Sequence, residues 1–152
     1  MWMGRVPRNH PAGFSLIELL VVVVIIGLLA SIAIPNLLSA HRKAKYSRAA
    51  ADSKTVTTQA IVYGNDKDAY PTSIAAMRAG GYANVADVDA WGTLYQLSPT
   101  LLSGNKTGSN DDVYMYSKGA SATGIYPVPF TNVTGDGGSV GYSSVYGSWT
   151  GF

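Results

Sequence analysis

Several residue types on which catalytic and metal sites depend are scarce in this chain. The 152 residues include no cysteine, which excludes a disulfide framework and a thiolate metal site. Only two histidines are present: His10 near the N-terminus and His41 among lysines, where a catalytic imidazole would be poorly buried. No glycine-rich motif followed by Lys and Ser or Thr is available to hold a phosphate. We therefore expect no enzyme, and any use of ATP would belong to partners.

Glutamate is almost absent as well, since Glu18 is the only one in the chain. It is the single ionisable residue between Phe14 and Ile34, a run composed mainly of Leu, Ile, Val and Ala. As a helix this run reaches about 31 Å, roughly the thickness of the hydrocarbon layer. Strands rarely exceed about eight residues, so the length excludes a strand. The run predicts a membrane-spanning helix.

A charged carboxylate inside hydrocarbon costs about 3 kcal/mol or more, so Glu18 needs a partner. No Lys, Arg or His lies between His10 and His41. If the chain were cut after Gly13, however, the new amino group of Phe14 would lie one helical turn from Glu18. Glycine, which has no Cβ, suits a protease that must approach the backbone closely.

The string Gly13-Phe14-Ser15-Leu16-Ile17-Glu18, after a short basic leader and before an apolar run that ends in Ala33-Ile34-Pro35-Asn36, resembles the N-terminal signature of type IV pilins and type II secretion pseudopilins. The resemblance implies that a prepilin peptidase cuts after Gly13 and methylates Phe14. It also implies that Glu18 neutralises the Phe14 amino terminus of a neighbouring subunit in a filament. An ordinary secretory signal and a simple membrane anchor are alternatives, but neither accounts for Glu18.

Length and resemblance together predict four segments and an α+β fold. These are a cleaved leader (1–13), a membrane-spanning or filament-core helix (14–35), an amphipathic continuation of that helix (36–64) and a small antiparallel β-sheet head (65–152), as in the pilin fold. A head of this size has a marginal core of its own and must pack on the helix. Pro35 predicts a kink or a locally melted stretch over residues 33–36.

The pattern beyond Pro35 indicates which helix face meets the head. Small and apolar residues recur at steps of three and four and predict a buried stripe: Ala49, Ser53, Val56, Ala60 and Tyr63. Gly64 and Asn65 predict the end of the helix. In the head we expect a short helix over 74–79 and strands over 91–97, 113–116 and 140–146. Pro127 and Pro129 confine residues 125–130 to a loop or an edge strand.

Charge is distributed unevenly along the chain. Residues 42–54 carry a net charge of +4, whereas the chain from Thr55 onward carries −3. A positive-inside count places the head in the cytoplasm, but the resemblance implies a cytoplasmic N-terminus and a periplasmic head, and we adopt the latter because the sorting signal is more specific. The acidic head argues against nucleic acid. The basic face fits solvent or lipid headgroups: Arg42, Lys43, Lys45 and Lys54.

Several head strings are similar in order to landmarks of the major type II secretion pseudopilin: Asn65 to Thr72, Asp89 to Gly92, Tyr95-Gln96, Tyr116 to Gly119 and Gly147 to Trp149. The resemblance implies calcium held by acidic residues in the C-terminal loops, yet residues 117–122 and 141–149 contain neither Asp nor Glu. Calcium takes six or more oxygens, so solvated turns are the favoured interpretation of the remaining weak candidates: Asp111, Asp112 and Asp136. An aromatic group offers either a recognition surface or, as we favour, internal packing: Tyr142, Tyr146, Trp149 and Phe152.

The sequence thus predicts a structural subunit of a pilin-type filament, first inserted in the bacterial inner membrane. A type II secretion pseudopilus is the favoured assembly; the alternatives are a type IV pilus, used for adhesion, motility, DNA uptake or electron transfer, and an anchored binding module that does not polymerise. Expected partners are the chain itself, related minor pilins or pseudopilins, the prepilin peptidase, membrane lipid and an inner-membrane assembly platform with its ATPase. No cofactor is expected apart from the weak calcium candidates.

Overall fold

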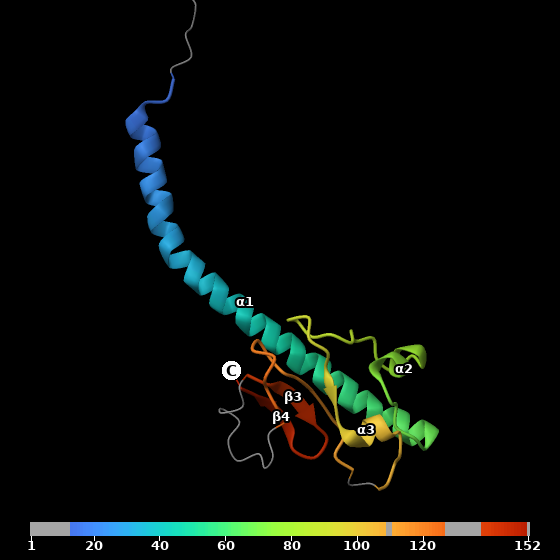
Figure 1. Cartoon of the computed structure of the whole chain (residues 1–152). Helices are drawn as coiled ribbons and strands as arrows, with labels where there is room; N and C mark the ends of the chain where they lie inside the picture. Colours follow the sequence, from blue (N-terminus) through green and yellow to red (C-terminus); the bar gives the residue numbers. More distant parts are fainter. Residues whose placement is uncertain (1–12, 109–110, 127–137, 152) are drawn as a thin grey trace, which may run out of the picture. The chain divides into compact units, whose positions relative to one another are not determined.

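The computed structural model describes residues 13–108, 111–126 and 138–151 (Figure 1). The chain separates into two compact units, Met1–Ala40 and His41–Phe152, and each is considered by itself. Helix α1 (Leu16–Lys67) contributes residues to both units. A long helix together with a small antiparallel sheet confirms the predicted α+β class.

The described part of the first unit is the apolar portion of α1. Its large apolar side chains, from Leu16 to Leu38, are each between 47% and 88% exposed. The helix is long and apolar enough to cross a membrane, as predicted from length and composition. It continues through Pro35 without interruption, so residues 33–36 are helical rather than melted. The kink at Pro35 stays a prediction.

The second unit is organised on the later part of α1, where one face is buried. The face carries mostly small residues: Tyr46, Ala49, Ser53, Val56, Thr57, Ala60 and Gly64. Four of the five residues in the predicted stripe are fully buried, and Tyr63 is half-buried. Small side chains on a helix let a sheet approach its backbone closely, which is what a small head with a limited core requires.

The helix end predicted at Gly64 and Asn65 is wrong, because α1 continues to Lys67. Gly64 is buried inside the helix, and a Cβ on it would lie 2.7 Å from the ring of Tyr70. This glycine therefore serves a close contact rather than a helix stop. The helix ends before Asp68, whose φ of 52° is left-handed.

Four short strands form one antiparallel sheet in the order β1-β2-β3-β4. They are β1 (Gln96–Leu97), β2 (Tyr114–Ser117), β3 (Val140–Ser143) and β4 (Gly147–Thr150). Figure 1 shows β3 and β4 alongside the later part of α1, and the Thr57 hydroxyl donates to the Tyr142 carbonyl at 3.2 Å. The core between helix and sheet includes Val56, Met115 and Val140, all fully buried.

Two of the predicted head elements are confirmed. Helix α2 (Ile74–Ala79) has the predicted bounds and begins at Ser73, whose hydroxyl accepts from the Ala76 amide. Strand β2 lies within one residue of the predicted 113–116. For α2 the local signal is the capping serine, and for β2 it is the alternation of side chains; both agree with the packing.

The other head predictions are wrong in part. Of the strand expected over 91–97, only Gln96–Leu97 belongs to the sheet, and the strand expected over 140–146 ends at Ser143, where a turn leads into the unpredicted β4. Helix α3 (Pro99–Ser103) was also missed, although Ser98 caps its start and Gly104 ends it with a φ of 71°. Most of the predicted loop or edge over 125–130 lies outside the described residues.

One buried hydroxyl of α1, that of Ser53, is predicted to lower the stability of the head. Among the described residues, the Ser53 hydroxyl is a buried polar group without a hydrogen-bond partner. Ser53→Ala should therefore stabilise the head by about 1 kcal/mol, measured as a higher melting temperature of the chain in detergent. The matched control is Thr57→Val, which removes a hydroxyl that is hydrogen-bonded on the same face and should lower it. A Ser53→Ala variant less stable than wild type would contradict this account.

Candidate functional site

The predicted processing site lies in exposed, non-helical backbone directly before α1. A Cβ added to Gly13 would meet no atom within 4 Å, and the Phe14 side chain is 85% exposed. Residues 13–15 have no regular secondary structure. The bond between Gly13 and Phe14 is thus open to approach by a protease.

Glu18 has a local hydrogen-bond partner that the sequence analysis missed. Its Oε2 accepts from the Ser15 amide at 2.9 Å and from the Ser15 hydroxyl at 3.0 Å, while the Ser15 Oγ accepts from the Glu18 amide at 3.3 Å. This reciprocal arrangement is a capping box, and its signal, Ser-x-x-Glu before an apolar run, is present in the sequence. The capping box satisfies backbone donors but leaves the negative charge of Glu18 in place.

Small residues interrupt the apolar surface farther along α1. Space around Gly27 is open, and the Ser31 hydroxyl donates to the Leu28 carbonyl at 2.7 Å. The serine is thereby satisfied within its own helix. A Gly-x-x-x-Ser pair on an exposed apolar surface permits the close approach of another helix.

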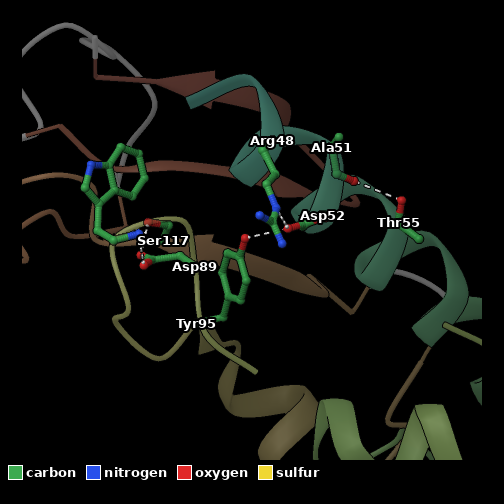
Figure 2. Close-up of polar contacts among 8 residues, drawn as sticks. Arg48, Ala51, Asp52, Thr55, Asp89, Tyr95 and Ser117 are labelled. Atoms are coloured by element: carbon green, nitrogen blue, oxygen red, sulfur yellow. Dashed lines mark hydrogen bonds and ion pairs between the residues drawn. The ribbon is translucent and has the colours of Figure 1, made fainter. Parts of the chain in front are cut away.

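In the second unit, a polar contact ties the segment before β1 to α1 (Figure 2). The Tyr95 hydroxyl donates to Asp52 Oδ2 at 2.9 Å, and Arg48 Nε lies 3.8 Å from the same oxygen. Burial raises the pKa of the Tyr95 phenol, and the hydrogen bond to Asp52 raises this pKa further. The phenol therefore stays protonated and serves as a donor. Four residues before Tyr95, Trp91 packs edge-on against Tyr46, with ring centroids 4.8 Å apart.

Asp89 is a buried carboxylate, 7% exposed, that joins two of the head strings. Its Oδ1 accepts from the Trp91 and Thr93 amides, both at 2.9 Å, and its Oδ2 accepts from the Ser117 hydroxyl at 2.5 Å. Figure 2 shows the Asp89 and Ser117 side chains pointing toward each other. These bonds bend residues 89–93 into a turn, which is why the predicted strand over 91–97 is short.

The weak calcium candidates that the structure describes accept hydrogen bonds from the protein. Asp111 accepts from the Thr107 hydroxyl at 2.6 Å and from the Thr107 and Gly108 amides. The Thr107 hydroxyl is the main cause of a lowered pKa at Asp111. Asp112 accepts from the hydroxyls of Tyr126 and Ser143. Asp136 lies outside the described residues, and within them no group of three His, Cys, Asp or Glu side chains could hold a metal.

Comparison with known proteins finds matches to the N-terminal helix and to much of the whole chain. The family described as "Prokaryotic N-terminal methylation motif" matches residues 8–34, which include the exposed Gly13-Phe14 bond and Glu18. The type II secretion system core protein G of Pseudomonas aeruginosa is 32% identical over 130 residues, covering 74% of this chain and 86% of the relative. The Vibrio cholerae protein of the same name is 37% identical over 103 residues, covering 57% and 70%.

The chain belongs to the type II secretion system core protein G family. A second kind of relative, the type IV major pilin protein PilA of Myxococcus xanthus, is 45% identical over 64 residues, covering 42% of this chain and 28% of the pilin. The similarity to core protein G thus extends over far more of the chain and must include part of the head.

Of the four aromatic residues predicted as one group in this core protein G homologue, the three that the structure describes differ in their exposure. Trp149 is buried and packs near Tyr116 and Tyr126, as the packing interpretation predicted, whereas Tyr146 is 61% exposed. Tyr142 is half-buried, and Phe152 lies outside the described residues. The predicted basic face is exposed: Arg42, Lys43, Lys45 and Lys54.

The contact between Tyr95 and Asp52 gives a pH-dependent prediction. Tyr95→Phe should lower the stability of the head by about 2 kcal/mol near neutral pH, because it removes a hydrogen bond to a charged group. Because the pKa of Tyr95 is higher in the folded head than in the unfolded chain, its phenol contributes fully to stability below the unfolded pKa of about 10. This contribution is lost as the pH rises from the unfolded pKa through the folded pKa. The deficit of the variant should therefore narrow above pH about 10 in thermal melts. Tyr63→Phe, which keeps the ring contact with Tyr82, is the control; a deficit that is constant from pH 7 to 11 would contradict this account.

Proposed function

We propose that this chain is a prepilin that is cut after Gly13, methylated at the Phe14 amino group and polymerised into the pseudopilus of a type II secretion system. The observation that carries the proposal is an exposed apolar helix that begins directly after an accessible Gly13-Phe14 bond. Membership in the core protein G family supports the pseudopilus as the assembly.

An exposed apolar helix of this kind requires a cover. Burying one Val, Leu or Ile side chain contributes about 1.5–3 kcal/mol, so a run of them is not stable in water. Before assembly the cover is lipid; in a filament it is the helices of sister subunits. Lipid tails are as apolar as leucine, so the hydrophobic effect alone does not select sister helices over lipid. Close packing at Gly27 and Ser31 and the charge of Glu18 supply the preference.

The charge of Glu18 then has a specific role. Cleavage after Gly13 creates a cation at Phe14, and pairing it with Glu18 of a neighbour removes two uncompensated charges from an apolar layer. The capping box with Ser15 holds the Glu18 carboxylate at the start of the helix, where that pairing takes place. The pairing of Phe14 with Glu18 of a neighbour also fixes how far one helix is shifted along the next in the filament.

Orientation and partners follow from the same scheme. The N-terminus lies in the cytoplasm and the head in the periplasm, with the exposed cations of residues 42–48 at the lipid headgroups before assembly. A prepilin peptidase, related minor pseudopilins and an inner-membrane platform with its ATPase act on or beside the subunit. The proposed role is structural and involves no catalysis by this chain.

A type IV pilus is the second candidate, favoured by the 45% identity to a type IV major pilin over 64 residues. Both assemblies use the same helix and the same processing, so their distinction depends on where the filament is found. Recovery in filaments sheared from cells favours the pilus, and retention in the envelope favours the pseudopilus.

Glu18→Gln should prevent assembly while leaving cleavage intact. Glutamine can still complete a capping box, so this variant removes only the charge. We expect filament yield to fall at least tenfold, measured by quantifying the chain in both the sheared and the envelope filament fractions at native expression.

Two variants separate the charge from the cap. Ser15→Ala removes the capping hydroxyl and keeps Glu18, so it should assemble close to wild type, whereas Glu18→Ala should fail as Glu18→Gln does. If Glu18→Gln assembles normally and Ser15→Ala fails, Glu18 acts as a helix cap and the pairing is wrong. An anchored binding module that never polymerises would give no filaments from any variant or from wild type.

Gly13→Val should leave the precursor uncut. A branched side chain at this position obstructs the approach of a peptidase to the backbone, whereas the glycine leaves open space. The N-terminal mass of the purified chain distinguishes a precursor that retains the leader from a mature chain that begins at methylated Phe14. Gly27→Val, in the same helix but away from the cut, should be processed as wild type. A mature N-terminus on Gly13→Val would refute cleavage at this bond.

A further inference from the structure

The segment from Lys118 to Tyr126, here named the return loop, follows β2 directly and folds back onto its own first residues. Within the loop, the Gly124 amide donates to the Lys118 carbonyl at 3.0 Å and the Ala122 amide to the Gly119 carbonyl at 3.1 Å. A Cβ on Gly119 would lie 1.8 Å from the Gly138 carbonyl oxygen, so the backbone is tightly packed there. This is the region in which the resemblance implies calcium.

Asp89 fastens the start of the return loop. The Ser117 hydroxyl donates to Asp89 and accepts from the Gly119 amide at 2.9 Å, so one serine joins the carboxylate to the first turn of the loop. With the Trp91 and Thr93 amides, three protein donors occupy the buried carboxylate. Little of it remains open to another ligand.

Asp112 fastens the end of the return loop. Its two oxygens accept from the Tyr126 and Ser143 hydroxyls, one each. The Tyr126 ring stacks on Tyr114 with centroids 3.8 Å apart and an interplanar angle of 16°, and it meets Trp149 edge-on at 5.4 Å. The loop end is therefore held by the Asp112 carboxylate and by aromatic contacts of Tyr126.

These residues do not fit a calcium site. Calcium takes six to eight oxygens, usually with several carboxylates facing one cation. The return loop has no Asp or Glu, and the carboxylates at its two ends are each occupied by protein donors from different elements. In the described ranges no three acidic or histidine side chains converge.

We propose that Asp89 and Asp112, as hydrogen-bond acceptors at the two ends of the return loop, replace calcium in this chain and make the fold of the head independent of it. Asp89 holds the start of the loop through Ser117, and Asp112 joins Tyr126 at the loop end to Ser143 of β3. A head closed in this way keeps its fold in calcium-poor surroundings.

The test is the melting temperature of the full mature chain in detergent, with EDTA or with millimolar calcium chloride. The whole chain is used so that every carboxylate is present, Asp136 included. We expect the two melting temperatures to agree within about 1 °C. A site filled at 100 times its dissociation constant would raise the value by roughly 10 °C or more, and a saturable rise of that kind would overturn the proposal.

Variants test the carboxylates themselves. Asp89→Asn and Asp112→Asn should each lower the melting temperature by several degrees, equally with and without calcium. The matched control is Asp68→Asn, an exposed carboxylate outside the network, which should melt no lower than wild type because Asn tolerates its left-handed φ. If Asp89→Asn does not fold, Ser117→Ala removes one bond to the same carboxylate and the bond from the Gly119 amide, and it should show a calcium-independent loss. Variants that melt as wild type would refute the role of the carboxylates.

Melting does not depend on polymerisation. The calcium test can therefore fail while filament assembly succeeds, and assembly can fail while the calcium test succeeds.

Discussion

The close approach of the sheet to one face of α1 is the contact on which the head depends. That face presents Ala49, Ser53, Ala60 and Gly64, and these small residues let β3 come near enough for Thr57 to donate to a strand carbonyl. A small domain gains little from its core alone, so close helix packing supplies what additional strands would otherwise provide. The Ser53 hydroxyl, which has no hydrogen-bond partner among the described residues, is tolerated because the small side chain permits this approach.

The same helix has two kinds of surface, and the division between them accounts for the proposed function. Before Leu38 its apolar side chains are exposed, whereas from Tyr46 a narrow stripe is buried in the head. The basic residues follow the exposed apolar stretch in the sequence. One helix thus has a surface for lipid or sister helices and a surface for its own head, which is what a subunit that passes from membrane to filament requires.

Local patterns predicted much of this structure. The apolar run, the small-residue stripe, α2 and β2 follow from periodicity and capping, which act within a few residues. Long-range contacts explain the errors. Gly64 looked like a helix stop, but Tyr70 packs against it; residues 91–95 alternate like a strand, but Asp89 bends them into a turn. At the candidate site, processing between Gly13 and Phe14 stays a prediction, whereas the capping box at Glu18 has a local signal, Ser-x-x-Glu, that the interpretation of Glu18 did not include. The pairing of Asp89 with Ser117 had no local signal, since the two residues lie 28 positions apart.

The distance along the chain between α1 and the strands that cover it sets an order of folding. The bond from Thr57 to the Tyr142 carbonyl spans 85 residues, and β3 and β4 follow every other described element in the sequence. Contacts this far apart form late, after the cost of closing a long loop has been met. During synthesis the apolar helix emerges well before the strands that complete the head. If the apolar helix enters the membrane as it emerges, in line with the proposed function, the nascent subunit is anchored before its head is folded.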